Sequence, residues 1–310
     1  MKLDFALFFL AIAQLAVAAP KLKTRASVDE VASIGYAAQN GGTSGGSGGS
    51  TTTVTTLDEL TAAVEGDDAK IVIVSGTITG DDGDVVKVGS NTSVLGESGA
   101  TLVGVGLRVL KQSNVIIRNL KIQKVLAPTD AIGIQASSQI IFTPILNAFL
   151  YDGLLDITHG STGITVSNSY LHDHYKASLV GHSDSNGSED KAITVTYALN
   201  HFSTLNSRTP SFRFGTGHIF NNLFTSLNDG INTRDGAQLL VENNVFEETK
   251  KCLYSTDEGY AVANGNDFGE DGENTAEEGT LTDVGYEYDL VEVGSVKSTV
   301  EAGAGATLDF

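Results

Sequence analysis

A three-residue pattern, asparagine then any residue then phenylalanine, returns along this chain at a constant interval. It occurs at 200–202, 222–224 and 244–246, which are 22 residues apart, and Asn119 and Asn168 occupy similar places after apolar segments. A fixed interval of this length is typical of a solenoid, in which each repeat stacks only on its neighbours. Because about 22 residues hold three short strands and three turns, the interval predicts an all-β fold, a parallel β-helix with stacked columns of Asn and Phe.

Two other architectures fit this interval less well. The segments around the triplets are short and rich in Val, Ile and Thr, as in KIVIVSGTITG and NVIIRNLKIQKV, and such segments are typical of strands. Leucine-rich repeats have a similar period, but their leucine-dense consensus is absent from the sequence. A β-sandwich also has short strands, but it does not require Asn and Phe to return at a fixed interval. Residues 57–64 are the one clear short helix of the sequence, with Thr56 as N-cap.

The N-terminal residues have the features of a secretory signal. Lys2 precedes a mostly apolar run from residue 5 to 17, and small residues follow at 16–18. The run is too short for a membrane anchor. The domain boundaries that we expect are a signal peptide at 1–18, a short leader or propeptide at 19–33 and the β-helix at 34–310, and we expect the protein to be secreted and extracellular.

Charge and cysteine content narrow the possible partners. The formal net charge of −19 argues against nucleic acid or an anionic membrane as partner, because both bind basic surfaces. We expect a monomer.

Cys252 is the only cysteine, so no intrachain disulfide can form and stability must come from the core, the repeats or a metal. Residues 40–50 have the composition of a flexible linker, and the acidic residues 257–287 are expected to form a polar end cap.

The stretch from residue 152 to 215 holds the candidate site. Asp152 and Asp156 lie four residues apart, about 13 Å on one face of an extended strand. A bend at Gly153 would bring them close enough to bind one hard cation. A lone pair with this spacing is far more often two solvated acids at a turn. The basic residues downstream set this pair apart: Lys176, Arg208 and Arg213.

Several blocks of this stretch and its surroundings resemble the pectate lyase family, in its fungal branch with a right-handed parallel β-helix. They are YDGLLDITHG, HDHYK, VGHSDSNGSED, SRTPSFRFG and DGINTRDGAQLLVENNVF, in that order. The resemblance covers nearly all of residues 34–290. It also implies that NGGTSGGSGGS belongs to the beginning of the mature domain and is not a linker.

The resemblance implies calcium-assisted β-elimination of α-1,4-linked polygalacturonate, the pectate of plant cell walls, giving unsaturated oligogalacturonides. By resemblance Asp152 and Asp156 are ligands of Ca²⁺, Arg208 is the catalytic base, and Lys176 and Arg213 bind the substrate carboxylate. Guanidinium pKa values lie above about 12, so an arginine base needs a local positive field. If Arg208 is not the base, it stabilises the negative charge that develops on the substrate carboxylate in the transition state. A non-catalytic β-helix that binds galacturonan is the alternative; a pectin lyase would lack the acidic pair.

Three further motifs are weaker candidates. His172 and His174 share a strand face with no obvious third ligand, which favours a structural role over a metal site. The loop at 184–190 has alternating acidic and amide oxygens, but a hydrogen-bonded surface turn is favoured over a calcium loop. Asn91 and Asn186 begin N-glycosylation acceptor motifs.

One segment departs from the family pattern. Residues 139–151, QIIFTPILNAFLY, lie where the family carries Trp-x-Asp-His and an acid-rich loop with another calcium aspartate. Thr143 and Pro144 stand in place of Asp-His, and proline cannot donate to an interior ladder. Either the lineage has lost this ligand or the gene model is misread. We expect a disturbed rung, and calcium affinity and activity below those of a relative with the full loop.

Overall fold

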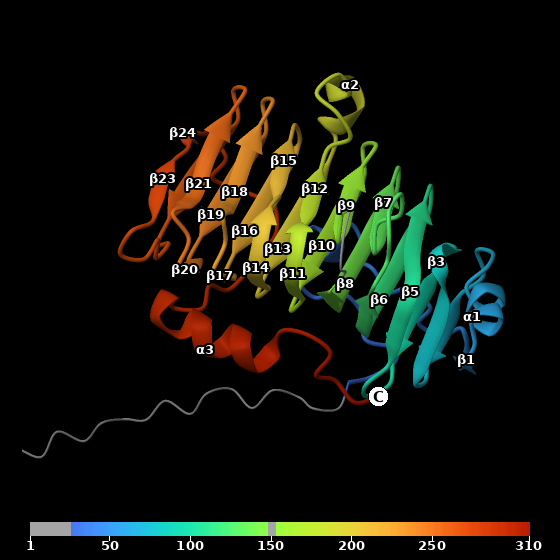
Figure 1. The fold of residues 1–310 in the computed structure, drawn as a ribbon. Helices are drawn as coiled ribbons and strands as arrows, with labels where there is room; N and C mark the ends of the chain where they lie inside the picture. The colour runs from blue at the N-terminus through green and yellow to red at the C-terminus, as the bar shows by residue number, and fades with distance from the viewer. Residues whose placement is uncertain (1–25, 148–152) are drawn as a thin grey trace, which may run out of the picture.

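The chain winds into a solenoid of short strands, each paired in parallel with strands one turn before and after it (Figure 1). The computed structural model describes residues 26–147 and 153–310, without the side chains of 82 and 144–147. Its stacked strands make three faces, here called A, B and C. The predicted parallel β-helix is therefore confirmed.

Each face is a ladder of strands in chain order, and the long strands β3, β5, β6 and β8 bend from one face into the next. Face A contains β1 (Ser50–Val54), β2 (Lys70–Val74), β4 (Thr92–Gly96), the first halves of β6 (Ser113–Gln123) and β8 (Ser138–Asn147), β10 (Thr162–Ser167), β13 (Thr194–Ala198), β16 (Thr216–Phe220), β19 (Gln238–Glu242), β22 (Tyr260–Asn264) and β24 (Glu277–Glu278). Face B contains the first halves of β3 (Thr77–Lys87) and β5 (Thr101–Leu110), the second halves of β6 and β8, β11 (Tyr170–Lys176), β14 (His201–Ser207), β17 (Leu223–Thr225) and β20 (Val245–Glu247). Face C contains the second halves of β3 and β5, β7 (Ile132–Gln135), β9 (Leu155–Thr158), β12 (Ser178–Val180), β15 (Ser211–Arg213), β18 (Asp229–Arg234), β21 (Lys251–Thr256) and β23 (Glu273–Thr275). The helices are η1 (Tyr36–Ala38), α1 (Leu57–Ala63), α2 (Gly187–Asp190) and α3 (Val293–Gly303).

Stacked side chains explain the 22-residue interval. Asn200 donates through Nδ2 to Oδ1 of Asn222 (2.9 Å), and Asn222 donates likewise to Asn244 (2.9 Å). These side chains are fully buried, so each amide satisfies polar groups that would otherwise be costly inside the solenoid. The rings at 202, 224 and 246 stack beside them, with centroids 5.0 and 4.4 Å apart. Both predicted columns are confirmed, and both continue one rung further, to Asn266 and Phe268.

Asn119 and Asn168 lie at a different corner position from the one predicted. Each directly precedes the ladder position of its rung, as Asn221 and Asn243 do, and has a left-handed backbone, with φ of 58° and 49°. The carbonyl of Gly96 accepts a hydrogen bond from Asn119 Nδ2 (2.7 Å). Asparagine tolerates positive φ better than most residues, which explains its return at this corner.

The predicted disturbance at Pro144 is present. Arg118 of β6 pairs with Thr143, whereas Lys121 pairs with Ile145, so two residues of β6 stand opposite Pro144 alone. Proline is locked near φ −65° and cannot take the left-handed conformation that Asn119 has at this corner. The rung is therefore one residue short where its neighbours turn, and the segment that departs from the family pattern forms strand β8 as far as residue 147. None of the described helices is long and apolar enough to cross a membrane.

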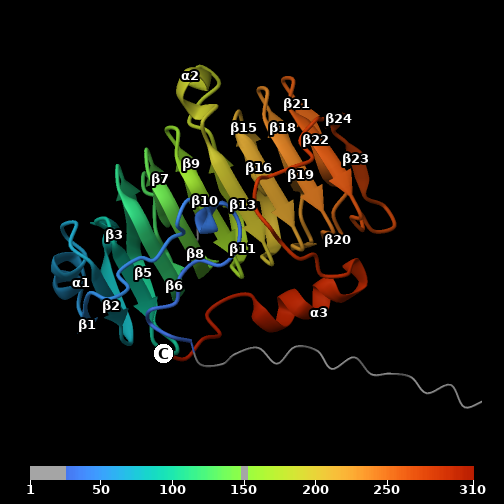
Figure 2. The same cartoon turned by 180° about the vertical axis from the view of Figure 1, so that it is seen from behind.

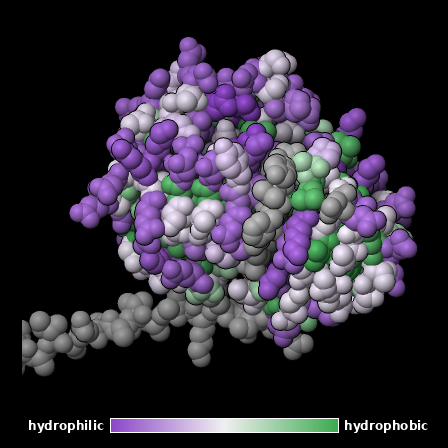
Figure 3. Space-filling view, in the orientation of Figure 1, coloured by the Kyte–Doolittle hydropathy of each residue, from purple (hydrophilic) through white to green (hydrophobic). Residues whose placement is uncertain are grey.

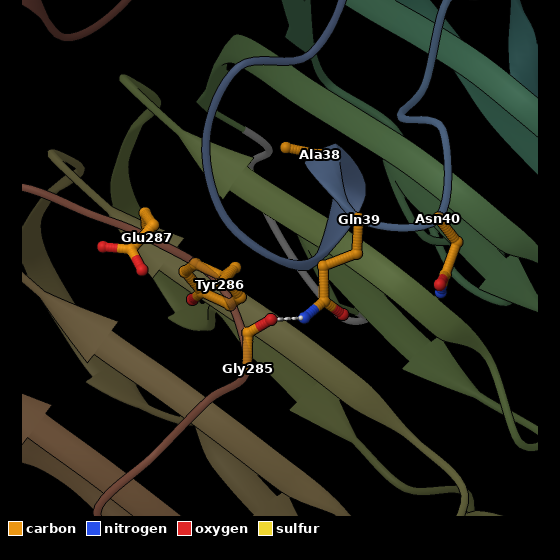
Figure 4. Close-up of a pocket in the computed structure, with 6 residues that line it drawn as sticks. All are labelled: Ala38, Gln39, Asn40, Gly285, Tyr286 and Glu287. Atoms are coloured by element: carbon orange, nitrogen blue, oxygen red, sulfur yellow. Dashed lines mark hydrogen bonds between the residues drawn. The ribbon is translucent and has the colours of Figure 1, made fainter.

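The N-terminal and C-terminal segments both lie over the outer side of face A (Figure 2). Residues 40–49 are ordered turns against the sheet, and a Cβ on Gly46 would come within 1.8 Å of a backbone oxygen of the next turn, so the linker interpretation is wrong. Gln39 Nε2 donates to the carbonyl of Gly285 (2.7 Å) where the segments meet (Figure 4). Tyr286 is hydrogen-bonded to the buried His218 (2.7 Å), whose pKa burial lowers to about 4.

The predicted helix is confirmed, whereas the predicted boundaries of the signal peptide and leader stay predictions. Helix α1 begins after Thr56, which caps it together with Glu59 in a capping box. Strands β23 and β24 are exposed along their length, as predicted for the polar end cap. The last residues of the predicted cap, 281–287, instead pack over face A, where Val284 is buried. Cys252 is fully buried and donates to Thr249 O (3.0 Å); burial raises the pKa of its thiol to about 11, which leaves it unreactive.

Candidate functional site

The corner that leads into face C brings several predicted site residues together. Backbone N–H groups at 131, 154 and 177 donate to carbonyl oxygens on the following rung, at 153, 177 and 207. These bonds place Asp130, Gly153, Lys176 and Arg208 at the same corner on consecutive rungs. Parallel strands lie about 4.8 Å apart, so each of these positions is within reach of the next.

Two carboxylates flank Gly153. Oδ1 of Asp130 accepts a hydrogen bond from Gly153 N (3.2 Å). Asp156, on β9, packs its carboxylate against the same glycine, because a Cβ at 153 would lie 2.3 Å from Asp156 Oδ1. Any side chain at 153 would displace this carboxylate. The predicted bend that brings Asp152 close to Asp156 stays a prediction. Asp152, the other predicted calcium ligand, lies outside the described residues.

Asp130 was not predicted as a site residue. The strand register pairs Gly133 with Asp156, so Asp130 stands opposite Gly153, 23 residues later. This spacing is close to the interval of the repeats, and extending the repeat backwards from Gly153 would have found it. The guanidinium of Arg108, on the preceding strand, lies over Gly133 beside the Asp130 carboxylate.

Arg208 points toward Asp156. Its Nη1 lies 3.8 Å from Asp156 Oδ2, beyond hydrogen-bonding distance, and its side chain is 27% exposed. Its backbone has φ of +61°, a conformation that non-glycine residues rarely adopt, which aims the residue out of the corner between β14 and β15. Asp156 is anchored separately, since its Oδ1 accepts from Leu179 N (3.0 Å). Arg208 is thus held loosely while Asp156 is fixed.

Arg213 stands further along face C and pairs in register with Arg234, which was not predicted. Both guanidiniums reach the same oxygen, Oδ1 of Asp184, at 2.5 and 3.3 Å. Asp235 approaches both through Oδ2, at 3.6 and 3.8 Å. The sequence signal for Arg234 was its spacing of 21 residues from Arg213, close to the repeat interval.

The described contacts of the weaker motifs are mainly packing and hydrogen bonds within the fold. His172 stacks on Tyr170 with centroids 4.1 Å apart, and His174 is buried with Nδ1 at 2.9 Å from Lys176 O. No group of three His, Cys, Asp or Glu side chains within 26–147 and 153–310 is arranged to hold a metal. The loop at 184–190 is a hydrogen-bonded turn, in which the buried Asp190 accepts from His182 N (2.6 Å).

The side-chain amides of the two glycosylation acceptors already donate hydrogen bonds within the fold. Asn91 Nδ2 donates to Asp67 O (2.8 Å), and Asn186 Nδ2 donates to both Glu189 and Asp190 (2.8 and 3.0 Å). A glycan replaces one amide hydrogen, so at Asn186 it would cost one of these bonds. Glycosylation at both positions stays a prediction.

The arrangement suits an extended anion with a hard cation. Asp130 and Asp156 lie on earlier rungs than Lys176, Arg208 and Arg213. Both signs of charge occur along the face, since Arg108 lies beside Asp130, and Asp184 and Asp235 lie beside Arg213. Asp130 and Asp156 supply oxygen donors, which are the ligands that calcium prefers. Viewed from the side of Figure 1, the surface is mainly hydrophilic, with apolar residues in small groups (Figure 3). The described part of the chain thus offers oxygen donors for a hard cation and cationic side chains for anionic groups on one face of a parallel β-helix.

Comparison with known proteins gives the family. The pectate lyase family model matches residues 10–134 and 147–307. Pectate lyase A of Aspergillus niger is 56% identical over 296 residues, covering 92% of this chain and 91% of its own length; pectate lyase A of Emericella nidulans is 58% identical, covering 92% and 90%. The chain belongs to the pectate lyase family and is an enzyme of that class.

Solved structures agree with this assignment. A pectate lyase from a Bacillus species in complex with trigalacturonate superposes with a TM-score of 0.81 at 28% identity, covering 89% of this chain and 99% of that one. Pectate lyase II of Xanthomonas campestris gives a TM-score of 0.78 at 26% identity, covering 89% and 98%. The family model leaves out residues 135–146, which include Pro144 and the short rung.

Proposed function

We propose that this enzyme cleaves α-1,4-linked polygalacturonate by calcium-assisted β-elimination. The observation that carries the proposal is the alignment of Asp130, Lys176 and Arg208 on one corner of face C, with Asp156 packed against Gly153 between them. A uronate polymer presents one carboxylate per sugar, and such an array offers cations to the carboxylates. A relative of the same fold has been solved with trigalacturonate, which supports this substrate class.

The chemical step needs a base that removes the C5 proton and cationic groups that stabilise the negative charge on the substrate. Arg208, in its neutral form, accepts the proton from C5 of a galacturonate unit and becomes a guanidinium. The C5–H electron pair forms the C4–C5 double bond, and the glycosidic oxygen leaves C4 with the bonding electrons. Protonation of that oxygen completes a chain end, so one bond breaks without water. Lys176 and Arg213 bind carboxylates of the substrate and hold it in register with Arg208.

Calcium fits the donor set at the acidic end. Asp152, Asp156 and Asp130 would hold it, and when bound it neutralises the uronate carboxylate and so acidifies the neighbouring C5 proton. Asp130 supplies an oxygen donor beside the pair predicted from the sequence. The acid-rich loop of the family is absent, which should lower calcium affinity, whereas Asp130 adds a carboxylate, which should raise it. The expectation that this chain binds calcium more weakly than a relative with the full loop therefore stays a prediction.

The features of residues 1–18 support secretion, and an extracellular enzyme would meet its polymer outside the cell. The products of elimination would be oligogalacturonides with one unsaturated end each.

Product analysis tests the proposal. Each β-elimination creates one reducing end and one C4–C5 double bond, so both should appear in equal amounts when polygalacturonate is digested. The double bond is followed by its ultraviolet absorbance and the reducing ends by a colorimetric assay. Reducing ends without the absorbance would indicate hydrolysis and overturn the elimination mechanism, and the appearance of neither would leave only binding to galacturonan.

A further inference from the structure

Two arginines on adjacent strands share one oxygen of an exposed carboxylate. Arg213 Nε donates to Asp184 Oδ1 at 2.5 Å, and Arg234 Nη2 lies 3.3 Å from the same atom. Asp184 belongs to the segment that carries α2, which projects beyond the neighbouring turns of face C (Figure 1). The Arg213 guanidinium holds the pKa of Asp184 below its usual range, so this carboxylate stays ionised.

The acids around the arginine pair differ in how firmly they are placed. Asp235 directly follows Arg234 and is 16% exposed, whereas Asp184 is 63% exposed. Arg213 also donates through Nη1 to the carbonyl of Gly181 (3.3 Å). Asp235 and this carbonyl would keep Arg213 in place if Asp184 left. Contacts of an exposed carboxylate are weak, because water competes for them.

We infer that Asp184 occupies, in the free enzyme, the place of a substrate carboxylate between Arg213 and Arg234, and that it thereby sets the affinity and charge selectivity of this subsite. The inference rests on the proposed function, in which Arg213 binds a carboxylate of the polymer. A uronate carboxylate replaces Asp184 as one anion for another. The apparent affinity is reduced by the fraction of time that Asp184 fills the subsite.

A methyl-esterified unit behaves differently at this subsite. It carries no charge with which to displace Asp184, and it suffers no repulsion from Asp184 if it binds beside the paired arginines. Removing the Asp184 charge should therefore help a free uronate and leave an ester largely unaffected. This difference separates competition by Asp184 from a general change in the fold.

The test compares Asp184→Asn with Asp257→Asn in the full-length enzyme. Asp257 is 61% exposed, pairs with Arg234 at 3.4 Å and carries the same charge, so its variant controls for net charge. We expect Asp184→Asn to lower KM for polygalacturonate by about two- to fivefold with little change in kcat. Asp257→Asn should change KM less, and neither variant should change KM for highly methyl-esterified pectin.

A double variant and a binding measurement complete the design. If Asp184 acts through the arginine pair, its substitution should give no gain when Arg213 is already alanine, which a double-mutant cycle measures. Calorimetry with trigalacturonate and a chelator should show the same two- to fivefold gain without turnover. A KM that rises in Asp184→Asn would show that Asp184 organises the arginines and would overturn the inference. The calorimetric result decides it even if the enzyme proves inactive on polygalacturonate, an outcome that would contradict only the proposed function.

Discussion

Replacing Arg208 by lysine should lower kcat on polygalacturonate by at least about 100-fold while changing KM by less than about threefold. Lysine keeps the positive charge but loses the planar fork and reaches a different point, so the group that meets C5 is displaced. Because the side chain is 27% exposed and its only ion pair with a described residue is the 3.8 Å contact to Asp156, the fold should tolerate the change.

Steady-state kinetics of Arg208→Lys and Arg213→Lys, run side by side, separate the two roles. The Arg213 variant should mainly raise KM, since Arg213 lies on β15, away from the corner. Near-normal turnover in Arg208→Lys would remove Arg208 from the chemical step.

The second large effect is expected at Asp156. Asparagine keeps the oxygen that accepts from Leu179 N (3.0 Å), so the β9–β12 pairing should survive. The substitution removes one of the three carboxylates proposed to hold calcium, and calcium affinity depends on the number of charged ligands. We expect Asp156→Asn to weaken calcium binding by at least about tenfold and to raise, by a similar factor, the calcium concentration that gives half-maximal activity.

Asp229→Asn is the matched control for this experiment. Asp229 lies on β18 of the same face and pairs with Lys251 at 3.7 Å, so its loss changes the net charge equally. Calcium calorimetry on both variants and the wild type gives the answer. Equal affinity in Asp156→Asn and Asp229→Asn would exclude Asp156 as a ligand.

The repeats could be predicted because each rung obeys a local rule. Asn200 and Phe202 meet partners one turn away, and the interval alone identifies these partners. The same rule places Asp130 opposite Gly153, although a single carboxylate carries no signal until the register is known. The other charged residues of the corner were identified by their resemblance to family motifs, because Lys176 and Arg208 are 32 residues apart and do not follow the interval.

Contacts outside the repeat could not be predicted in this way. Asp184 reaches Arg234 across 50 residues, and Tyr286 reaches His218 across 68, through segments that follow no period. The short rung shows the same limit: Pro144 indicates a break, but only the pairing of Lys121 with Ile145 shows that one residue is missing at the turn.

The central claim is that this chain eliminates galacturonate with the help of calcium bound by its own carboxylates. The most direct measurement follows the ultraviolet absorbance of the unsaturated product from purified enzyme and polygalacturonate, first with a chelator and then after calcium is restored in excess. The account predicts no product in the first phase and immediate product formation in the second. Equal rates in both phases would contradict it.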